Sequence, residues 1–232
     1  MDKRKQDQLK KEAAIKAAKM VKNNSVLGVG TGSTVAFFID ALGKRKNEEG
    51  LNLKHIVTTS NRSKKQLESL GFKVDELKDI DQADLTVDGA DRVDSNLDGI
   101  KGGGGALTLE KNVAVNSKQN IWIVDESKVV DHLSGFPLPV EVLPISAEQN
   151  FRKFATEGLK PKWRLDNNGE RYITHYGNYI IDLAVDPIPI PKGLAGYLDR
   201  TVGVVEHGLF LDICNEVIIA KGNGSIEAKK RN

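Results

Sequence analysis

Hydrophobic and polar residues alternate in blocks along the first 130 residues of the chain. Short β-branched runs predict buried strands, and segments with apolar residues every three or four positions predict helices between them. The expected strands are residues 25–30, 54–58, 73–77, 84–87 and 120–125, and the expected helices are residues 3–22, 35–42, 62–70 and 106–113. Strands that alternate with helices are typical of βαβ units, so we predict an α/β fold with a Rossmann-like parallel sheet. Gly43 and Gly71 are expected to end the second and third helices.

The pattern changes beyond residue 130, where Pro137, Pro139 and Pro144 punctuate an extended segment. After it we expect a helix at 147–156, a hairpin about the Asn-Asn-Gly turn at 167–169, a strand at 178–185, a helix at 193–199 and a strand at 202–210. This β-α-β-β-α-β order predicts a smaller α+β domain of ferredoxin-like type.

We therefore expect an α/β domain formed by residues 1–130 and 206–232, with residues 131–205 as an inserted α+β domain. Near the end of the chain, residues 217–220 are expected to return to the first sheet. Residues 228–232 are expected to form a frayed basic tail.

Composition narrows the class of protein. The chain has 232 residues, 39% of them hydrophobic and 28% charged, which is ordinary for a globular protein with a sizeable core. A net charge of +2 gives no strong field toward nucleic acid or membrane. The single cysteine, Cys214, cannot form an internal disulfide and fits a reducing compartment. With no apolar run of membrane-spanning length and no secretory signal pattern, we expect a cytoplasmic protein.

A small-residue loop, Thr31, Gly32, Ser33 and Thr34, follows the first predicted strand and precedes a helix. This arrangement points main-chain N–H groups at a phosphate, but it is also typical of a tight turn with Ser or Thr as the helix N-cap. Residues alone leave both interpretations open. A dinucleotide fingerprint is excluded because position 33 is serine rather than glycine, and a P-loop is excluded because its Gly-Lys pair is missing.

The densest group of chemically active residues lies between positions 84 and 110. Asp88 and Asp91 flank a turn at Gly89, Lys101 precedes four glycines at 102–105, and Glu110 lies on the helix that follows. The segment Asp94–Gly99 resembles the first half of a calcium-binding loop, but position 105 is glycine where that loop needs glutamate, so we predict a polar turn.

These residue types suit proton transfer next to a carbonyl group. Glu110 can act as the base, Lys101 can stabilise the enolate oxygen, and glycines let main-chain N–H groups approach that oxygen closely. Base and oxyanion stabilisation can each contribute on the order of 3 kcal/mol. A surface glutamate, an Asp-Gly turn and a solvated lysine would look the same in sequence, although a four-glycine run costs ordering entropy that a simple connector need not bear.

Five motifs together carry a family resemblance. They are GVGTGST at 28–34, VDGAD at 87–91, KGGGGALT at 101–108 followed by Glu110, DESK at 125–128 and FPLPVEV at 136–142. In this order the chain resembles ribose-5-phosphate isomerase of type A from about residue 11 to residue 226.

The resemblance implies reversible conversion of D-ribose 5-phosphate and D-ribulose 5-phosphate through an ene-diolate, an aldose–ketose isomerisation of the pentose phosphate pathway. It implies Glu110 as the proton-transferring base, with Lys101, Asp88 and Asp91 as further catalytic residues. The implied substrate-binding residues are Thr31, Gly32, Ser33, Thr34, Asp88, Gly89, Ala90, Asp91, Lys101, Gly102, Gly103, Gly104 and Lys128. It implies no cofactor and no metal, a small sugar phosphate as partner, and a homodimer or higher homo-oligomer.

One alternative and two departures accompany this resemblance. The alternative is a non-catalytic sugar-phosphate sensor domain of the same fold. Arg92 stands where the family commonly has an acid, which reverses the charge beside Asp91. The segment Thr174–Asn178 replaces the family's frequent Asp-Asn-Gly-Asn pattern.

Overall fold

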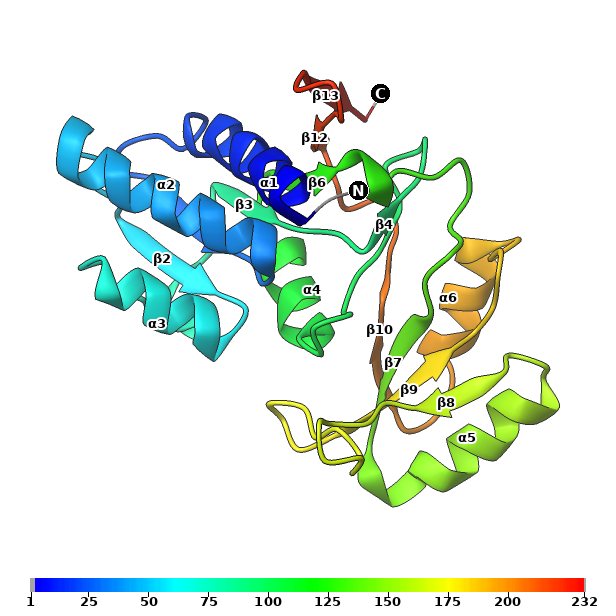
Figure 1. The fold of residues 1–232 in the computed structure, drawn as a ribbon. Coiled ribbons are helices and arrows are strands. Elements are labelled where there is room, and N and C mark those ends of the chain that lie inside the picture. Colours follow the sequence, from blue (N-terminus) through cyan, green and yellow to red (C-terminus); the bar gives the residue numbers. More distant parts are fainter. Residues whose placement is uncertain (1–2, 232) are drawn as a thin grey trace. The chain divides into compact units, whose positions relative to one another are not determined.

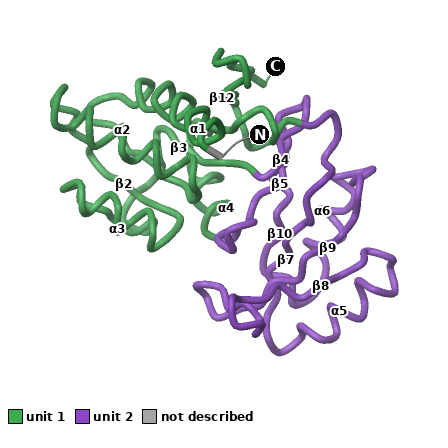
Figure 2. The backbone as a smooth tube through the Cα atoms, viewed as in Figure 1, with its two compact units in different colours: residues 1–90, 109–129, 212–232 green, residues 91–108, 130–211 purple. Residues whose placement is uncertain are grey.

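The computed structural model describes residues 3–231 and divides into two compact units, coloured separately in Figure 2. Unit 1 comprises the chain up to residue 90, residues 109–129 and the chain from residue 212 onward. Unit 2 comprises residues 91–108 and 130–211. The domain boundaries expected from the sequence stay a prediction. In the structure, residues 91–108 group with residues 130–211 in unit 2.

Unit 1 is built on a six-stranded sheet in the order β13-β12-β6-β3-β1-β2. Its strands are β1 (Val26–Val29), β2 (His55–Thr58), β3 (Leu85–Asp88), β6 (Asn120–Asp125), β12 (Glu216–Ala220) and β13 (Ile226–Lys230). All neighbouring pairs are parallel except β12 and β13. The expected parallel α/β sheet is confirmed, and so is the return of residues 217–220 to it.

Helices cover both faces of this sheet. The helices are α1 (Lys3–Ala18), α2 (Ser33–Glu49), α3 (Asn61–Ser69) and α4 (Leu107–Val115), whose first two residues belong to unit 2. Leu27 and Val29 of β1 pack into one cluster with α1 and α2, which lie side by side in Figure 1. Gly28 faces the other way, where an added Cβ would lie 2.9 Å from Val113 of α4. The alternation of side chains along β1 therefore separates the two helical layers.

Gly43 does not end α2, contrary to the expectation from sequence. The helix continues to Glu49 and ends at Gly50, whose left-handed backbone (φ 68°) lets its N–H bond the carbonyl of Arg45. Gly43 is buried within the helix, and a Cβ there would come 2.8 Å from Leu70 beyond the end of α3. The glycine serves close helix packing rather than helix termination.

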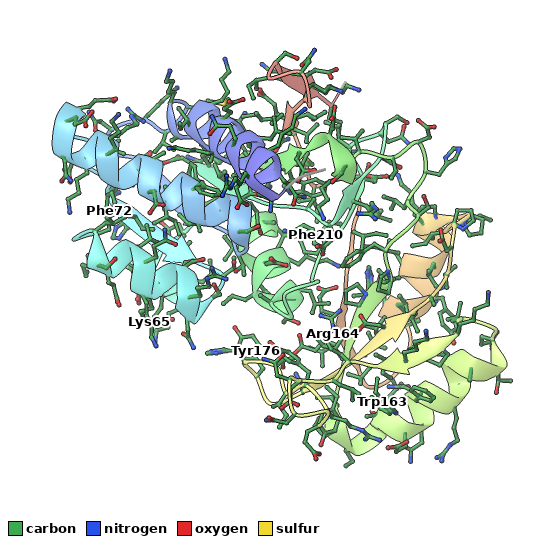
Figure 3. The ribbon with its side chains drawn as sticks, in the orientation of Figure 1. Lys65, Phe72, Trp163, Arg164, Tyr176 and Phe210 are labelled. Atoms are coloured by element: carbon green, nitrogen blue, oxygen red, sulfur yellow. The ribbon has the colours of Figure 1, made fainter. Side chains whose placement is uncertain are left out.

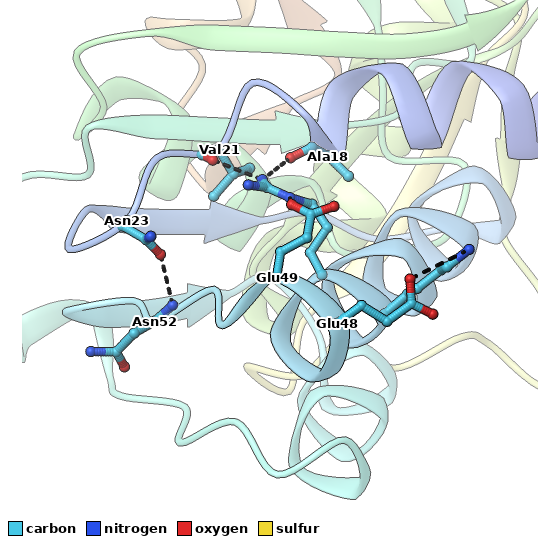
Figure 4. Close-up of polar contacts among 8 residues, drawn as sticks. Ala18, Val21, Asn23, Glu48, Glu49 and Asn52 are labelled. Carbon is cyan, nitrogen blue, oxygen red and sulfur yellow. Dashed lines mark hydrogen bonds and ion pairs between the residues drawn. The ribbon is translucent and has the colours of Figure 1, made fainter.

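Hydrogen bonds tie the C-terminal end of α1 and the loop after it to α2 and the segment that follows α2, as Figure 4 shows. Arg45 Nη1 donates to the carbonyls of Ala18 at 2.6 Å and Val21 at 2.8 Å. The side-chain oxygen of Asn23 accepts the main-chain N–H of Asn52 at 2.9 Å. The Arg45 bonds occupy main-chain carbonyls at and just beyond the end of α1, and the Asn23–Asn52 bond joins the loop after α1 to the segment after α2.

Two other expectations for unit 1 are wrong. The predicted tail contains the second half of β13, which pairs with β12 along its length; residue 232 lies outside the described residues. Its Lys229 and Lys230 are suited to an exposed edge strand, where charge opposes pairing with another chain. Residues 73–77 form no strand; a short 3₁₀ turn, η1 (Leu77–Asp79), begins there, with Glu76 and Asp79 capping each other.

Unit 2 contains a four-stranded antiparallel sheet in the order β10-β7-β9-β8. Its elements along the chain are β7 (Leu138–Val142), η3 (Pro144–Ser146), α5 (Ala147–Thr156), β8 (Pro161–Trp163), β9 (Tyr179–Leu183), α6 (Pro191–Asp199) and β10 (Val204–His207). Numbered within the unit, this order is 4-1-3-2, which is that of the ferredoxin-like fold. The expected second architecture is confirmed.

Two details of unit 2 differ from expectation. The hairpin at 167–169 has an isolated bridge between Leu165 and Arg171, with main-chain bonds from Asp166 N to Glu170 O at 2.8 Å and from Tyr172 N to Arg164 O at 2.9 Å, rather than extended strands. The strand expected at 202–210 is interrupted at Gly208. Its last residues form β11 (Leu209–Phe210), which joins a separate small sheet with β5 (Gly99–Ile100) and β4 (Arg92–Val93).

Candidate active site

In unit 1 the loop after β1 and the turn after β3 lie next to each other. The two strands are parallel neighbours, with Val29 opposite Val87, so both loops leave the same edge of the sheet. The carboxylate of Asp88 joins them, because its Oδ1 accepts the main-chain N–H of Thr31 at 3.0 Å and that of Gly89 at 2.7 Å. Ligands bind at this edge in parallel α/β sheets.

The Asp88 side chain can lie against the loop after β1 only because position 30 is glycine. Asp88 is buried, with 3% of its surface exposed, and a Cβ on Gly30 would lie only 1.9 Å from its carboxyl carbon. The carbonyl of Gly30 accepts the hydroxyl of Ser63 at 2.7 Å, which holds the loop from the α3 side. Position 30 therefore requires glycine for space.

The N-terminus of α2 can receive an anion. Its N-cap residue is Gly32, with φ 121°, so a serine or threonine side chain does not cap the helix as the alternative interpretation expected. The hydroxyl of Thr31 is engaged with that of Thr59 at 2.6 Å, whereas Gly32 and Ser33 are exposed. First-turn N–H groups of a 17-residue helix have no intrahelical acceptor and lie at its positive end.

Two further predicted site residues belong to unit 1. Glu110 lies in the first turn of α4 and is buried, with 6% exposure. Lys128 is half-buried and ends η2 (Glu126–Lys128), a 3₁₀ turn after β6. The side chain of Asp125 caps that turn by accepting the N–H of Ser127 at 3.0 Å.

In unit 2 the backbone and the charge of Lys101 are both held. Its main-chain N–H donates to the carbonyl of Gly208 at 2.9 Å. Its Nζ lies 5.3 Å from the centre of the Phe210 ring, which favours a cation electrostatically. Only 3% of Lys101 is exposed, so this is a buried cation rather than a solvated surface lysine.

The glycines after Lys101 form a loop that side chains would disrupt. Gly102 and Gly105 have left-handed backbones, with φ of 97° and 77°. A Cβ on Gly103 would lie 2.8 Å from the Asp91 carboxylate, and a Cβ on Gly105 would lie 2.5 Å from the hydroxyl of Tyr172. The N–H of Gly103 donates to Asp91 Oδ2 at 2.8 Å, so the loop binds one of the predicted catalytic acids directly.

Arg92, the unexpected cation beside Asp91, is occupied by main-chain carbonyls. It donates to Asp91 O at 2.7 Å, Ser134 O at 3.1 Å and Gly135 O at 2.5 Å. Its guanidinium also lies 5.7 Å from the Phe136 ring centre. Arg92 thus anchors the segment before β7.

Sequence reasoning missed a buried carboxylate on the central strand of unit 2. Glu141, 1% exposed, accepts the hydroxyl of Thr174 at 2.7 Å, the side-chain amide of Asn178 at 2.9 Å and the hydroxyl of Thr108. The departure at 174–178 therefore keeps two donors for this acid. The only signal in sequence was an acid between Val140 and Val142 in an apolar strand.

A second missed residue is Arg164, which directly follows β8. It contacts the carbonyls of Gly102 and Gly103 and forms a two-pronged pair with Asp182. Nothing local distinguishes it from the other arginines of the chain, because its partners are distant in sequence.

The calcium-like segment is a polar turn, as expected. The side chain of Asp94 accepts the N–H groups of Asn96 at 2.9 Å and Asp98 at 3.0 Å. Across residues 3–231, no group of three or more His, Cys, Asp or Glu side chains is arranged to hold a metal ion. Within that same range, no helix combines the length and apolar character needed to cross a membrane.

The family model and the relatives that match this chain share one description. A model of the family "Ribose 5-phosphate isomerase A (phosphoriboisomerase A)" matches residues 55–224. Ribose-5-phosphate isomerase A of Lactobacillus johnsonii is 81% identical over 100% of both chains, and that of Bifidobacterium adolescentis is 54% identical over 97% of this chain and 96% of its own.

Solved structures agree. Ribose 5-phosphate isomerase A from Neisseria gonorrhoeae superposes with a TM-score of 0.90 at 37% identity, covering 98% of each chain. A D-ribose-5-phosphate isomerase in complex with phospho-erythronic acid superposes with a TM-score of 0.92 at 36% identity, covering 100% of each chain. This chain belongs to the ribose 5-phosphate isomerase A family.

Proposed function

We propose that this protein interconverts D-ribose 5-phosphate and D-ribulose 5-phosphate. The observation that carries the proposal is similarity along the whole chain, at 81% identity, to relatives named for this isomerase. The structure of a relative with phospho-erythronic acid supports a site for a four-carbon acid phosphate, whose carboxylate resembles the planar ene-diolate.

Glu110 is the proposed base. It removes the proton from C2 of the open-chain aldose, which gives an ene-diolate with the negative charge on O1. It then returns the proton to C1 while the proton of the C2 hydroxyl passes to O1, so that C2 becomes the ketone and C1 carries a hydroxyl. A buried carboxylate on a helix suits this role, because its position is fixed and water competes little for it.

The remaining roles follow from charge and hydrogen-bonding capacity. Lys101 stabilises the negative oxygen of the ene-diolate, and Asp88 and Asp91 bind hydroxyls and move the protons needed for ring opening. Ala90 and the glycines at 89 and 102–104 contribute main-chain contacts. The phosphate is bound by residues 31–34 at the N-terminus of α2, with Lys128 as a further cation.

We further propose that the protein acts in the cytoplasm as a homodimer or higher homo-oligomer, which light scattering after size-exclusion chromatography would measure. The relatives reported above are named as isomerases, which favours the enzyme over a non-catalytic sugar-phosphate sensor.

The deciding experiment is turnover of ribose 5-phosphate by purified protein with EDTA present, followed as ketose formation. We expect conversion in both directions. Tight binding of the sugar phosphate without conversion would favour the sensor. The absence of both binding and conversion would refute both functions.

A further inference from the structure

We propose that Arg164 is a positioning residue for the isomerase, because it orients the glycine loop so that a main-chain N–H of that loop faces the substrate oxygen that becomes negative. This inference rests on the proposed function. Arg164 acts on catalysis through the loop, without contacting the substrate.

The first observation is the direction of the Arg164 side chain. In Figure 3 it leaves the sheet on the face opposite to Trp163, as alternation along a strand requires. Trp163 stacks on Phe151 of α5, at 4.9 Å between ring centres. Arg164 Nη1 instead donates to the carbonyls of Gly102 at 2.7 Å and Gly103 at 3.2 Å.

The second observation concerns the peptide between Gly102 and Gly103. Arg164 binds its carbonyl oxygen, and its N–H donates to Asp91 Oδ2 at 2.8 Å. The peptide is therefore held at both ends, between a cation and an acid. A donor on a carbonyl polarises the whole amide, so the N–H toward Asp91 becomes a stronger donor.

The peptide between Gly103 and Gly104 is the one that can bind the substrate oxygen. The carbonyl of Gly103 also points at Arg164, and in a trans peptide the N–H points the opposite way. The N–H of Gly104 is thereby directed away from Arg164, and both Gly103 and Gly104 are exposed. A main-chain N–H fixed in this way can stabilise an oxyanion without reorganisation at the moment of reaction.

Asp182 fixes the guanidinium. It accepts from Arg164 Nε at 2.9 Å and Nη2 at 2.5 Å, and the two side chains are only 17% and 13% exposed. Nε and Nη2 donate to the Asp182 carboxylate, while Nη1 donates to the glycine loop. Lysine cannot reproduce this, because an ammonium group is a point charge without a planar fork.

The test compares Arg164→Gln and Arg164→Lys with Arg171→Gln. Arg171 is a matched control in the same unit: its guanidinium pairs with Glu148 and covers the Trp163 ring. The readouts are kcat, KM for ribose 5-phosphate, the dissociation constant of phospho-erythronic acid by calorimetry, and the unfolding midpoint.

We expect both Arg164 variants to lower kcat on the order of 10-fold or more, and to weaken phospho-erythronic acid to a similar extent, with KM changed less than about threefold. Arg171→Gln should leave kcat and the acid's affinity unchanged. In a third variant, Arg164→Ala, guanidinium ion in the millimolar range should partly restore kcat. A kcat and an acid affinity within about twofold of Arg171→Gln would overturn the assignment, as would full rescue by lysine.

Folding defects are separated by a second variant. Asp182→Asn keeps Arg164 but loosens it, and should lower kcat and the acid's affinity in parallel by a smaller factor; unchanged values would also overturn the proposal. Wild-type protein that neither converts the sugar nor binds the acid would refute the proposed function, and with it the oxyanion that this role requires.

Discussion

The carboxylate of Asp88 accepts the main-chain N–H of Thr31 at 3.0 Å, which couples a predicted catalytic acid to the loop that precedes α2. The same oxygen accepts the N–H of Gly89, so its orientation is set by two donors. A change that moves either loop must therefore alter the position of Asp88, and Gly30 offers a direct way to produce one.

Gly30→Ala should displace Asp88, because the new Cβ would lie 1.9 Å from its carboxyl carbon. We expect kcat to fall at least about 10-fold, since small misplacement of a catalytic group is costly. Steady-state kinetics and thermal unfolding provide the measurement. Gly196→Ala in α6 is the control, because its Cβ has room and alanine favours a helix; it should keep the rate and raise stability by roughly 0.5–1 kcal/mol. Equal rates in both variants would contradict the role of Gly30.

Glu110→Gln should abolish turnover yet preserve binding, because the amide keeps the shape of the side chain and loses the base. A general base contributes about 10²–10⁴-fold, so the rate should fall by at least that range. Ketose formation and calorimetric binding of phospho-erythronic acid measure the two properties. Glu68→Gln, on the exposed face of α3, is the control. A near-normal rate would remove Glu110 from the mechanism.

Local patterns in the sequence were sufficient for most elements of both units. The strand-helix alternation predicted the parallel sheet, and the later order of elements predicted the ferredoxin-like sheet, because hydrophobic periodicity depends mainly on which face each element buries. Composition and spacing singled out the glycine loop and Glu110 as candidate site residues, and these assignments stay predictions. The named family resemblance then supplied their proposed roles.

The features that the sequence did not predict depend on contacts with residues far away in the chain. Gly43 resembles a helix end, but it makes room for Leu70. Arg164 and Glu141 act through contacts with residues 62 and 33 positions away, which no local period reveals. The charged residues of β13 resemble a tail because an edge strand and a solvated end favour the same side chains.

Lys101→Ala should reduce kcat about 10²–10³-fold, the range observed when an oxyanion-stabilising donor is removed. Its buried ammonium lies beside the Phe210 ring, so the charge is held in place rather than solvated. Lys162→Ala is the control, because Lys162 is exposed on β8. Separate determination of kcat and KM distinguishes the roles: a change confined to KM would make Lys101 a substrate anchor and not a catalytic residue.

Asp75→Asn should make the stability of the fold depend less on pH in the acidic range. The hydrogen bonds from Lys73, and then from His55 at 2.9 Å, hold the pKa of Asp75 below its ordinary value of 3.8, against an opposing effect of burial. Because the folded pKa is the lower one, the stabilisation is complete above the unfolded value and disappears as pH falls through the folded value. Wild type should therefore exceed Asp75→Asn in unfolding midpoint at pH 5 to 7, and the gap should close below about pH 3.8. Thermal unfolding over this range measures the gap, with exposed Asp81→Asn as control. A gap that persists unchanged under strongly acidic conditions would show that the carboxylate charge of Asp75 is not its source.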